Sequence, residues 1–203
     1  MVLLIGIAVF SGLSLNLLLQ FALGTGGIAG DIHHKADEKR EIPYIQFFIL
    51  FSAVFLLWIL FKYITPVFWR GFSEFFLVFP FSALVCMGLE LLGEKIFPMV
   101  FPEFTGFKKT YTAITGYEGL VPASLFISFA VASNLADTFV LALSFSIGNM
   151  AAMFILNEIR RRSALESVPK YLRGSPLILI SMGLLSLIFA SVAWIIFKIL
   201  DVF

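Results

Sequence analysis

Two carboxamide side chains stand inside the first apolar stretch of the chain, GLSLNLLLQFALGTGGIAG at residues 12–30. Asn16 and Gln20 are four residues apart, which places them on one face of a continuous helix. Polar amides inside lipid are costly unless they face protein or a water-filled cavity. This face therefore predicts either a polar site or, as the alternative, two side chains that hydrogen-bond to neighbouring helices.

The same stretch ends in a glycine cluster that contains Gly24, Gly26 and Gly27. Glycines after an apolar run let the backbone leave the helix and approach another group closely. The cluster predicts that the first membrane segment is interrupted there, and that the interruption borders a site. Because glycine is also common in regular membrane helices, ordinary helix packing remains the alternative.

Other polar side chains are candidates for an ion or polar path. Glu90 lies near the inner end of a later apolar segment, where it is either a cation or proton site or an interfacial residue neutralised by Lys95. Ser128 and Asn134 are candidates to line a path opposite Asn16. The alternative for both residues is that they pack in a helix interface, as small polar residues ordinarily do.

The chain lacks the residue patterns of soluble enzymes. Its one cysteine, Cys86, allows no intrachain disulfide and no all-cysteine metal site built by this chain alone. The adjacent His33 and His34 point in different directions and make a poor chelating pair. No nucleophile–base pair, P-loop or dinucleotide fingerprint is present. We therefore expect no catalytic residue and no nucleic-acid partner, and any enzymatic activity would belong to a complex.

Composition places these residues in an integral membrane protein. The 203 residues are 60% hydrophobic and only 13% charged, and the mean hydropathy is +1.01. A soluble core of this size could not cover so much apolar surface. Apolar stretches of roughly 20 residues predict six transmembrane helices in one membrane domain, residues 1–203. The expected spans are Val2–Leu23, Tyr44–Ile64, Phe72–Leu92, Tyr117–Ser133, Ala136–Asn157 and Ser175–Ile199, with the fourth interrupted by Pro122.

The basic residues predict the orientation. The segments that follow the first, third and fifth spans carry 11 of the 14 lysines and arginines, and the positive-inside rule makes these segments cytoplasmic. Both termini then face outward. The spans also divide into halves of three, about 1–95 and 117–203, and each half opens on an irregular span. An odd number of spans inverts the second half, which is the pattern of inverted-repeat membrane proteins.

Several stretches carry a resemblance to a known family. Residues 159–189 combine an arginine after the fifth span, V-P-x-x-x-R-G at Val168–Gly174, and the sixth span. ELLGEKIFP at Glu90–Pro98, NLLLQFALG at Asn16–Gly24, and Gly148 match further family positions. Together they resemble the A subunit of the Rnf electron-transport complex and the related E subunit of the sodium-translocating NADH:quinone reductase.

The resemblance implies an all-α fold of six helices in two inverted halves, with the first and fourth helices broken. It implies a homologous sister subunit of opposite orientation, other subunits of an electron-transport complex, and the cytoplasmic membrane of a bacterium or archaeon. In the family, cysteines on the broken helices of the paired subunits hold a 2Fe–2S cluster. Here Gly26 and Ser128 occupy the matching positions. Glycine has no ligating side chain and serine is a poor substitute for a thiolate, so we expect no cofactor bound by this chain alone.

The expected function is therefore that of a membrane subunit in an ion-translocating electron-transport complex, as scaffold and as part of the ion or electron path. The alternative is a cofactor-free transporter or channel for ions or small solutes, built on the same inverted repeat. A purely structural assembly subunit is a third possibility. The transporter or channel alternative follows from the missing thiolate positions together with the polar Asn16 and Gln20.

Overall fold

The computed structural model describes residues 2–23, 42–64, 72–100, 119–165, 169 and 175–199. Within these residues all regular structure is helical and no strand occurs. The elements are α1 (Val2–Val9), the π-helical turn η1 (Phe10–Ser14), α2 (Leu17–Phe21), α4 (Ile42–Ile59), the π-helical turn η3 (Leu60–Ile64), α5 (Phe72–Val100), α7 (Leu120–Val131), α8 (Leu135–Leu165) and α9 (Ser175–Ile199).

Four of the described helices are long and apolar enough to cross a membrane: α4 with η3, α5, α8 and α9. Two shorter apolar segments accompany them, Gly6–Phe21 in the first span and Leu120–Val131 in α7. The predicted all-α fold is thus confirmed, with helices at all six expected spans. The sixth helix has the predicted bounds, Ser175–Ile199.

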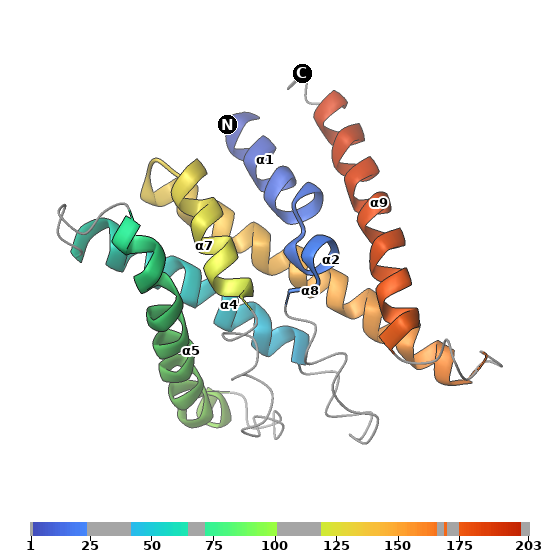
Figure 1. Cartoon of the computed structure of the whole chain (residues 1–203), viewed down its shortest axis with the longest axis horizontal. Helices are drawn as coiled ribbons and strands as arrows, with labels where there is room; N and C mark the ends of the chain where they lie inside the picture. Colours follow the sequence, from blue (N-terminus) through green and yellow to red (C-terminus); the bar gives the residue numbers. More distant parts are fainter. Residues whose placement is uncertain are drawn as a thin grey trace.

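The centre of the molecule is the pair α4 and α8, which cross with the most extensive contact between any two described elements. The first span and α9 lie against one side of this pair, and α7 and α5 lie against the other (Figure 1). Ala53 on α4 and Ala142 on α8 are fully buried in the shared core. Small residues at such crossings let two backbones approach closely, which favours helix association where lipid supplies no hydrophobic force.

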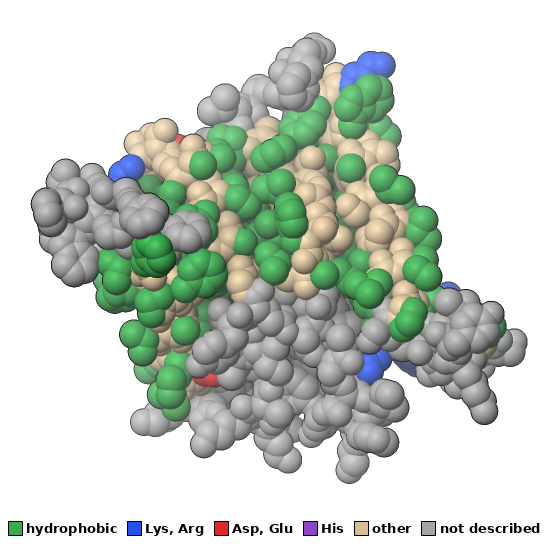
Figure 2. Space-filling model, in the orientation of Figure 1, with side chains coloured by type: hydrophobic (Ala, Val, Ile, Leu, Met, Phe, Trp, Pro, Cys, Tyr) green, Lys and Arg blue, Asp and Glu red, His purple; other side chains and the backbone are tan. Residues whose placement is uncertain are grey.

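The peripheral helices leave most of their apolar side chains exposed. Only 17% of the spanning window of α5 and 28% of that of α9 is buried inside the chain, against 56% for α8 and 44% for α4. Apolar side chains therefore cover the visible surface between the two ends of the bundle (Figure 2). Such a surface is costly in water and suits acyl chains or another membrane subunit.

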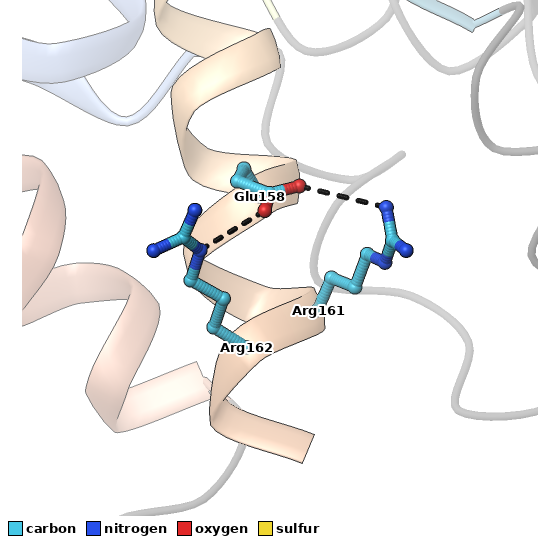
Figure 3. Close-up of polar contacts among 3 residues, drawn as sticks. All are labelled: Glu158, Arg161 and Arg162. Atoms are coloured by element: carbon cyan, nitrogen blue, oxygen red, sulfur yellow. Dashed lines mark hydrogen bonds and ion pairs between the residues drawn. The ribbon is translucent and has the colours of Figure 1, made fainter. Parts of the chain in front are cut away.

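Two helices extend beyond their predicted ends. α5 continues past Leu92 to Val100, through a stretch that hydropathy alone favours as an interfacial connection. α8 continues past Asn157 to Leu165. Its added turns carry the exposed side chains of Glu158, Arg161 and Arg162, with ion pairs from Glu158 to Arg161 (3.9 Å) and to Arg162 (3.0 Å), shown in Figure 3. Such pairs, and cations near a helix C-terminus, stabilise a solvated helix end that hydropathy does not detect.

The predicted interruption at Pro122 is not found within α7. Pro122 lies in the first turn of this helix, where a missing N–H costs no hydrogen bond, and α7 runs unbroken from Leu120 to Val131. Its start is Gly119, whose φ of 81° lies in the left-handed region that favours glycine. The short fourth span is therefore confirmed, and the expected break inside it is wrong for residues 120–131.

Candidate polar site at the broken first span

The first span is broken at Leu15–Asn16, before the glycine cluster is reached. α1 widens into η1, where the Leu15 N–H donates to the Phe10 carbonyl at 2.7 Å. Asn16 then takes an extended backbone, with φ −72° and ψ 104°, and caps the short helix α2. Asparagine favours such a position because its side chain competes for backbone groups that a continuous helix would use. The predicted break positions Gly24, Gly26 and Gly27 lie outside the described residues.

The Asn16 carboxamide links the two parts of the broken span to α8. Its Nδ2 donates to the Gly148 carbonyl at 2.9 Å and to the Gly12 carbonyl at 3.3 Å. Its Oδ1 accepts from the Leu19 N–H at 3.2 Å. The residue is only 3% exposed. The buried side chain therefore gives the Leu19 N–H, in the first turn of α2, the partner that the break removes, and it ties the broken span to the Gly148 carbonyl of α8.

The first span and α8 touch backbone to backbone beside this link. A Cβ on Gly148 would overlap the Gly12 carbonyl group, and a Cβ on Gly12 would stand 2.9 Å from the Ser144 carbonyl oxygen. Only glycine fits both positions without displacing a backbone. The glycine pair therefore sets how closely the broken span lies on α8, and this distance brings Asn16 within reach of Gly148.

Gln20 does not share the environment of Asn16. It is exposed on α2, and its Nε2 donates to the Ser14 carbonyl. The expectation of one shared polar face is wrong, because Asn16 lies at the break rather than within a continuous helix. A four-residue spacing places side chains on one face only where the helix between them is regular.

A small cavity adjoins the break. The space open to the centre of a water molecule is about 10 Å³, roughly what one water needs. Asn149 Oδ1 is buried there and has no hydrogen-bond partner among the described residues, while Asn149 Nδ2 lies 4.0 Å from Met153 Sδ. The lining residues come from the first span, α4, α7 and α8: Ser11, Asn16, Leu17, Leu18, Leu50, Leu120, Phe145 and Asn149.

The remaining candidate residues do not join this cavity. Ser128 is fully buried in α7, where its hydroxyl donates to the Ser124 carbonyl at 2.8 Å. Asn134 is exposed just before α8, and its N–H donates to Asp137 Oδ2 at 3.2 Å. Glu90 is half-buried on α5. Of the predicted path residues, only Asn16 lines the cavity.

Two cavity residues, Ser11 and Asn149, were not among the predicted path residues. Asn149 follows Gly148 within an apolar span, so the rule that selects Asn16, a carboxamide inside lipid, also selects Asn149. Ser11 offers no comparable signal, because a lone serine in a membrane helix ordinarily bonds to its own backbone. It does so here, donating to the Ala8 carbonyl at 3.2 Å.

The described residues do not fit a thiolate-held cluster. No group of three or more His, Cys, Asp or Glu side chains gathers in the described part of the chain. Ser128 presents a hydroxyl already engaged with its own helix, and Cys86 is buried on α5 rather than beside the break. What these residues form instead is a small, uncharged and mostly apolar cavity at the interruption of a membrane helix, with Ser11, Asn16 and Asn149 as its polar members.

Replacing Gly148 with alanine should destabilise the protein by about 1–3 kcal/mol, because the added methyl group overlaps the Gly12 backbone. Thermal unfolding of the detergent-purified chain measures the effect. Gly183→Ala on α9 is the matched control, since no atom lies within 4 Å of its added Cβ. Equal melting temperatures for the two variants would contradict the close approach.

Replacing Asn16 with alanine should cost about 1–2 kcal/mol, because the Leu19 N–H loses its capping partner and the hydrogen bond that links the first span to the Gly148 carbonyl of α8 is lost. The same unfolding measurement applies. Asn157→Ala serves as control, since it removes a half-buried carboxamide from α8 outside the cavity. If the control loses as much stability as Asn16→Ala, the bridging role of Asn16 is wrong.

Comparison of the sequence with protein-family models and with curated proteins gives no match.

Proposed function

We propose that this chain is a membrane subunit of an ion-translocating electron-transport complex of the Rnf or NADH:quinone reductase type, acting as scaffold and as part of the ion path. The observation that carries the proposal is the way its helices pair. If the halves about 1–95 and 117–203 are inverted repeats, each contact in one half has a counterpart in the other.

Most of the contacts between the described helices follow that rule. The first span packs on α8, and its counterpart α7 packs on α4. α4 packs on α5, as α8 packs on α9. η1 and α2 touch α9, as α7 touches α5. The pairs α4 with α8 and α2 with α7 are each their own counterpart, whereas the contact of α7 with α8 has no counterpart of similar extent between the first span and α4. This correspondence supports two inverted halves around the α4–α8 crossing, with the broken span near their shared axis.

Membership in an electron-transport complex rests on the resemblance at Glu90–Pro98 and Val168–Gly174. It brings a homologous sister subunit of opposite orientation and further redox subunits as partners. The large exposed apolar faces of α5 and α9 leave room for such a neighbour as well as for lipid. We propose that any iron–sulfur centre is held by another chain, because Ser128 and Cys86 do not supply a thiolate pair at the break.

We propose the bacterial or archaeal cytoplasmic membrane as the location, with both termini outside. The start of α1 and the end of α9 lie at one end of the bundle, and the arginine-bearing end of α8 lies at the other (Figure 1). Lys198 lies at the end of α9, with its Nζ 5.4 Å from the centre of the Trp194 ring. An exposed tryptophan beside a lysine suits the headgroup region.

Cysteine labelling tests the orientation in a Cys86→Ser background. With Lys198→Cys, a membrane-impermeant maleimide should label intact cells, because this helix end faces outward. With Arg162→Cys, labelling should require permeabilised cells, because the positive-inside rule places this end in the cytoplasm. The Cys86→Ser parent is the unlabelled control, and the opposite labelling pattern would reverse the topology.

A second function is favoured by one observation, the small cavity at the break, to which Ser11, Asn16 and Asn149 contribute polar side chains. A cofactor-free transporter or channel for ions or small solutes would need such a polar site and no redox partner. Flux into liposomes that contain the purified chain alone would favour this function. Absence of flux, together with electron transfer in a reconstituted complex, would reject it.

Affinity purification from native membranes tests the complex. A tagged chain should retain a homologous membrane subunit together with flavin-bearing and iron–sulfur subunits, because the exposed faces of α5 and α9 are otherwise covered only by lipid. Untagged membranes processed in parallel give the background, and mass spectrometry identifies the partners. A stable chain recovered without any partner would contradict the proposal.

A further inference from the structure

Asn149 on α8 carries a buried hydrogen-bond acceptor that no described residue serves. The residue is 3% exposed, and its Oδ1 atom has no hydrogen-bond partner in the described part of the chain. Its Nδ2 atom lies 4.0 Å from Met153 Sδ, a weak acceptor that engages at most one of the two Nδ2 hydrogens. A buried carboxamide without partners is costly in an apolar interior. The side chain therefore calls for a small occupant of the adjoining cavity that can both donate and accept.

Two further oxygens at the cavity can accept a hydrogen bond. The Ser11 hydroxyl gives its hydrogen to the Ala8 carbonyl and keeps its lone pairs. Asn16 Oδ1 accepts from the Leu19 N–H and keeps a second lone pair, while Asn16 Nδ2 donates to two backbone carbonyls. With Asn149 Oδ1, these atoms form the accepting part of the lining.

The start of α7 brings donors to the same cavity. Leu120, the first residue of α7, belongs to the lining and is 1% exposed. The N–H groups in the first turn of a helix have no partner within that helix. Gly119, the residue before Leu120, provides no side-chain cap for them. A buried helix start of this kind needs an acceptor, which a small occupant with a lone pair supplies.

From these groups we propose that the cavity is a binding site for one structural water molecule that joins α8, the first span and α7. Its two hydrogens are donated to oxygens of the lining, Asn149 Oδ1 first among them. Its oxygen accepts from the start of α7 or from the second Nδ2 hydrogen of Asn149. A buried water ordinarily makes about three hydrogen bonds, and the space of about 10 Å³ is roughly what one water needs.

Other occupants fit this lining less well. A cation would meet the partial positive charge of the start of α7, and most of the lining consists of leucine and phenylalanine side chains. An anion would meet the lone pairs of Ser11, Asn16 and Asn149. An apolar occupant would leave Asn149 Oδ1 without a partner. Water is the small molecule that satisfies donors and acceptors together.

The water extends the polar link at the break. Asn16 already bonds the first span to the Gly148 carbonyl of α8. The water carries this link on to Asn149 and to the start of α7, so the two short apolar segments are joined at one depth. The inference goes beyond the proposed function and does not depend on it, because such a water stabilises the break in a redox subunit and in a transporter alike.

Nuclear magnetic resonance on the full-length chain in detergent tests the site. In deuterated protein with ¹⁵N-labelled asparagine and protonated amides, the Asn149 side-chain amide should show a rotating-frame cross-peak with water of sign opposite to the diagonal. That sign marks a water held beside the amide, whereas hydrogen exchange gives the same sign as the diagonal. Asn149→Gln identifies the signal by removing it. Asn157, half-buried on α8 outside the cavity, is the control and should show no such peak.

Two substitutions of Ser11 separate a water in the cavity from water elsewhere. Ser11→Val fills the space with two methyl groups and should abolish the Asn149 cross-peak while the amide signal itself remains. Ser11→Ala removes one acceptor but leaves the space open, so the cross-peak should persist.

The unmodified protein keeps the test decisive if Ser11→Val fails to fold. Absence of the Asn149 cross-peak in the unmodified protein, or its persistence in a folded Ser11→Val variant, would overturn the inference. An experimental density map that resolves ordered water gives a second readout, with a peak expected about 2.7–3.2 Å from Asn149 Oδ1. A map without this peak would also overturn the inference, and neither result bears on the partners recovered by affinity purification.

Discussion

The requirement that every backbone polar group find a partner inside lipid governs this structure. A break in a membrane helix releases carbonyl and N–H groups, and each one left unpaired costs several kcal/mol. Asn16 meets this requirement for the first span by serving Gly12 and Leu19 on its own segment and Gly148 on α8. The glycine contact between Gly12 and Gly148 brings the two segments close enough for this carboxamide to join them, and the cavity adjoins the same point.

Burial separates the helices into two roles. α4 and α8 form a buried pair of small and apolar side chains, whereas α5 and α9 keep most of their surface outside the chain. The contacts between α4 and α8 lie inside the chain, so they do not depend on what covers its outer surface. The exposed pair supplies the surface on which a lipid or protein neighbour acts. α9 packs directly on η1 and α2, which carry part of the cavity lining, whereas α5 packs on α4 and α7, which carry Leu50 and Leu120 of that lining.

Hydropathy predicted the long spans well, because crossing a bilayer demands about 20 apolar residues whatever the packing. The extensions of α5 past Leu92 and of α8 past Asn157 were missed, because charged residues near the start of both lower the hydropathy below that of a membrane span. The glycine cluster at residues 24–27 predicted a break in the first span. The break lies at Leu15–Asn16 instead, where the Asn16 side chain caps α2 and donates to the Gly148 carbonyl. The sequence could not show that Asn149 lines a cavity, because this depends on which residues of the first span, α4 and α7 pack around it. Among the candidate residues, a carboxamide in an apolar span was the most informative signal.

The contact between Gly12 and Gly148 has a mechanical consequence. Two backbones meet there with no side chain between them, so neither helix can slide along the other without separating. The Asn16 carboxamide fastens the same point from the side. The contact therefore fixes the first span on α8 at one point of its length. The cavity adjoins this point and borrows two of its walls, the break at Asn16 and the turn of α8 at Asn149, from the two segments that the contact joins.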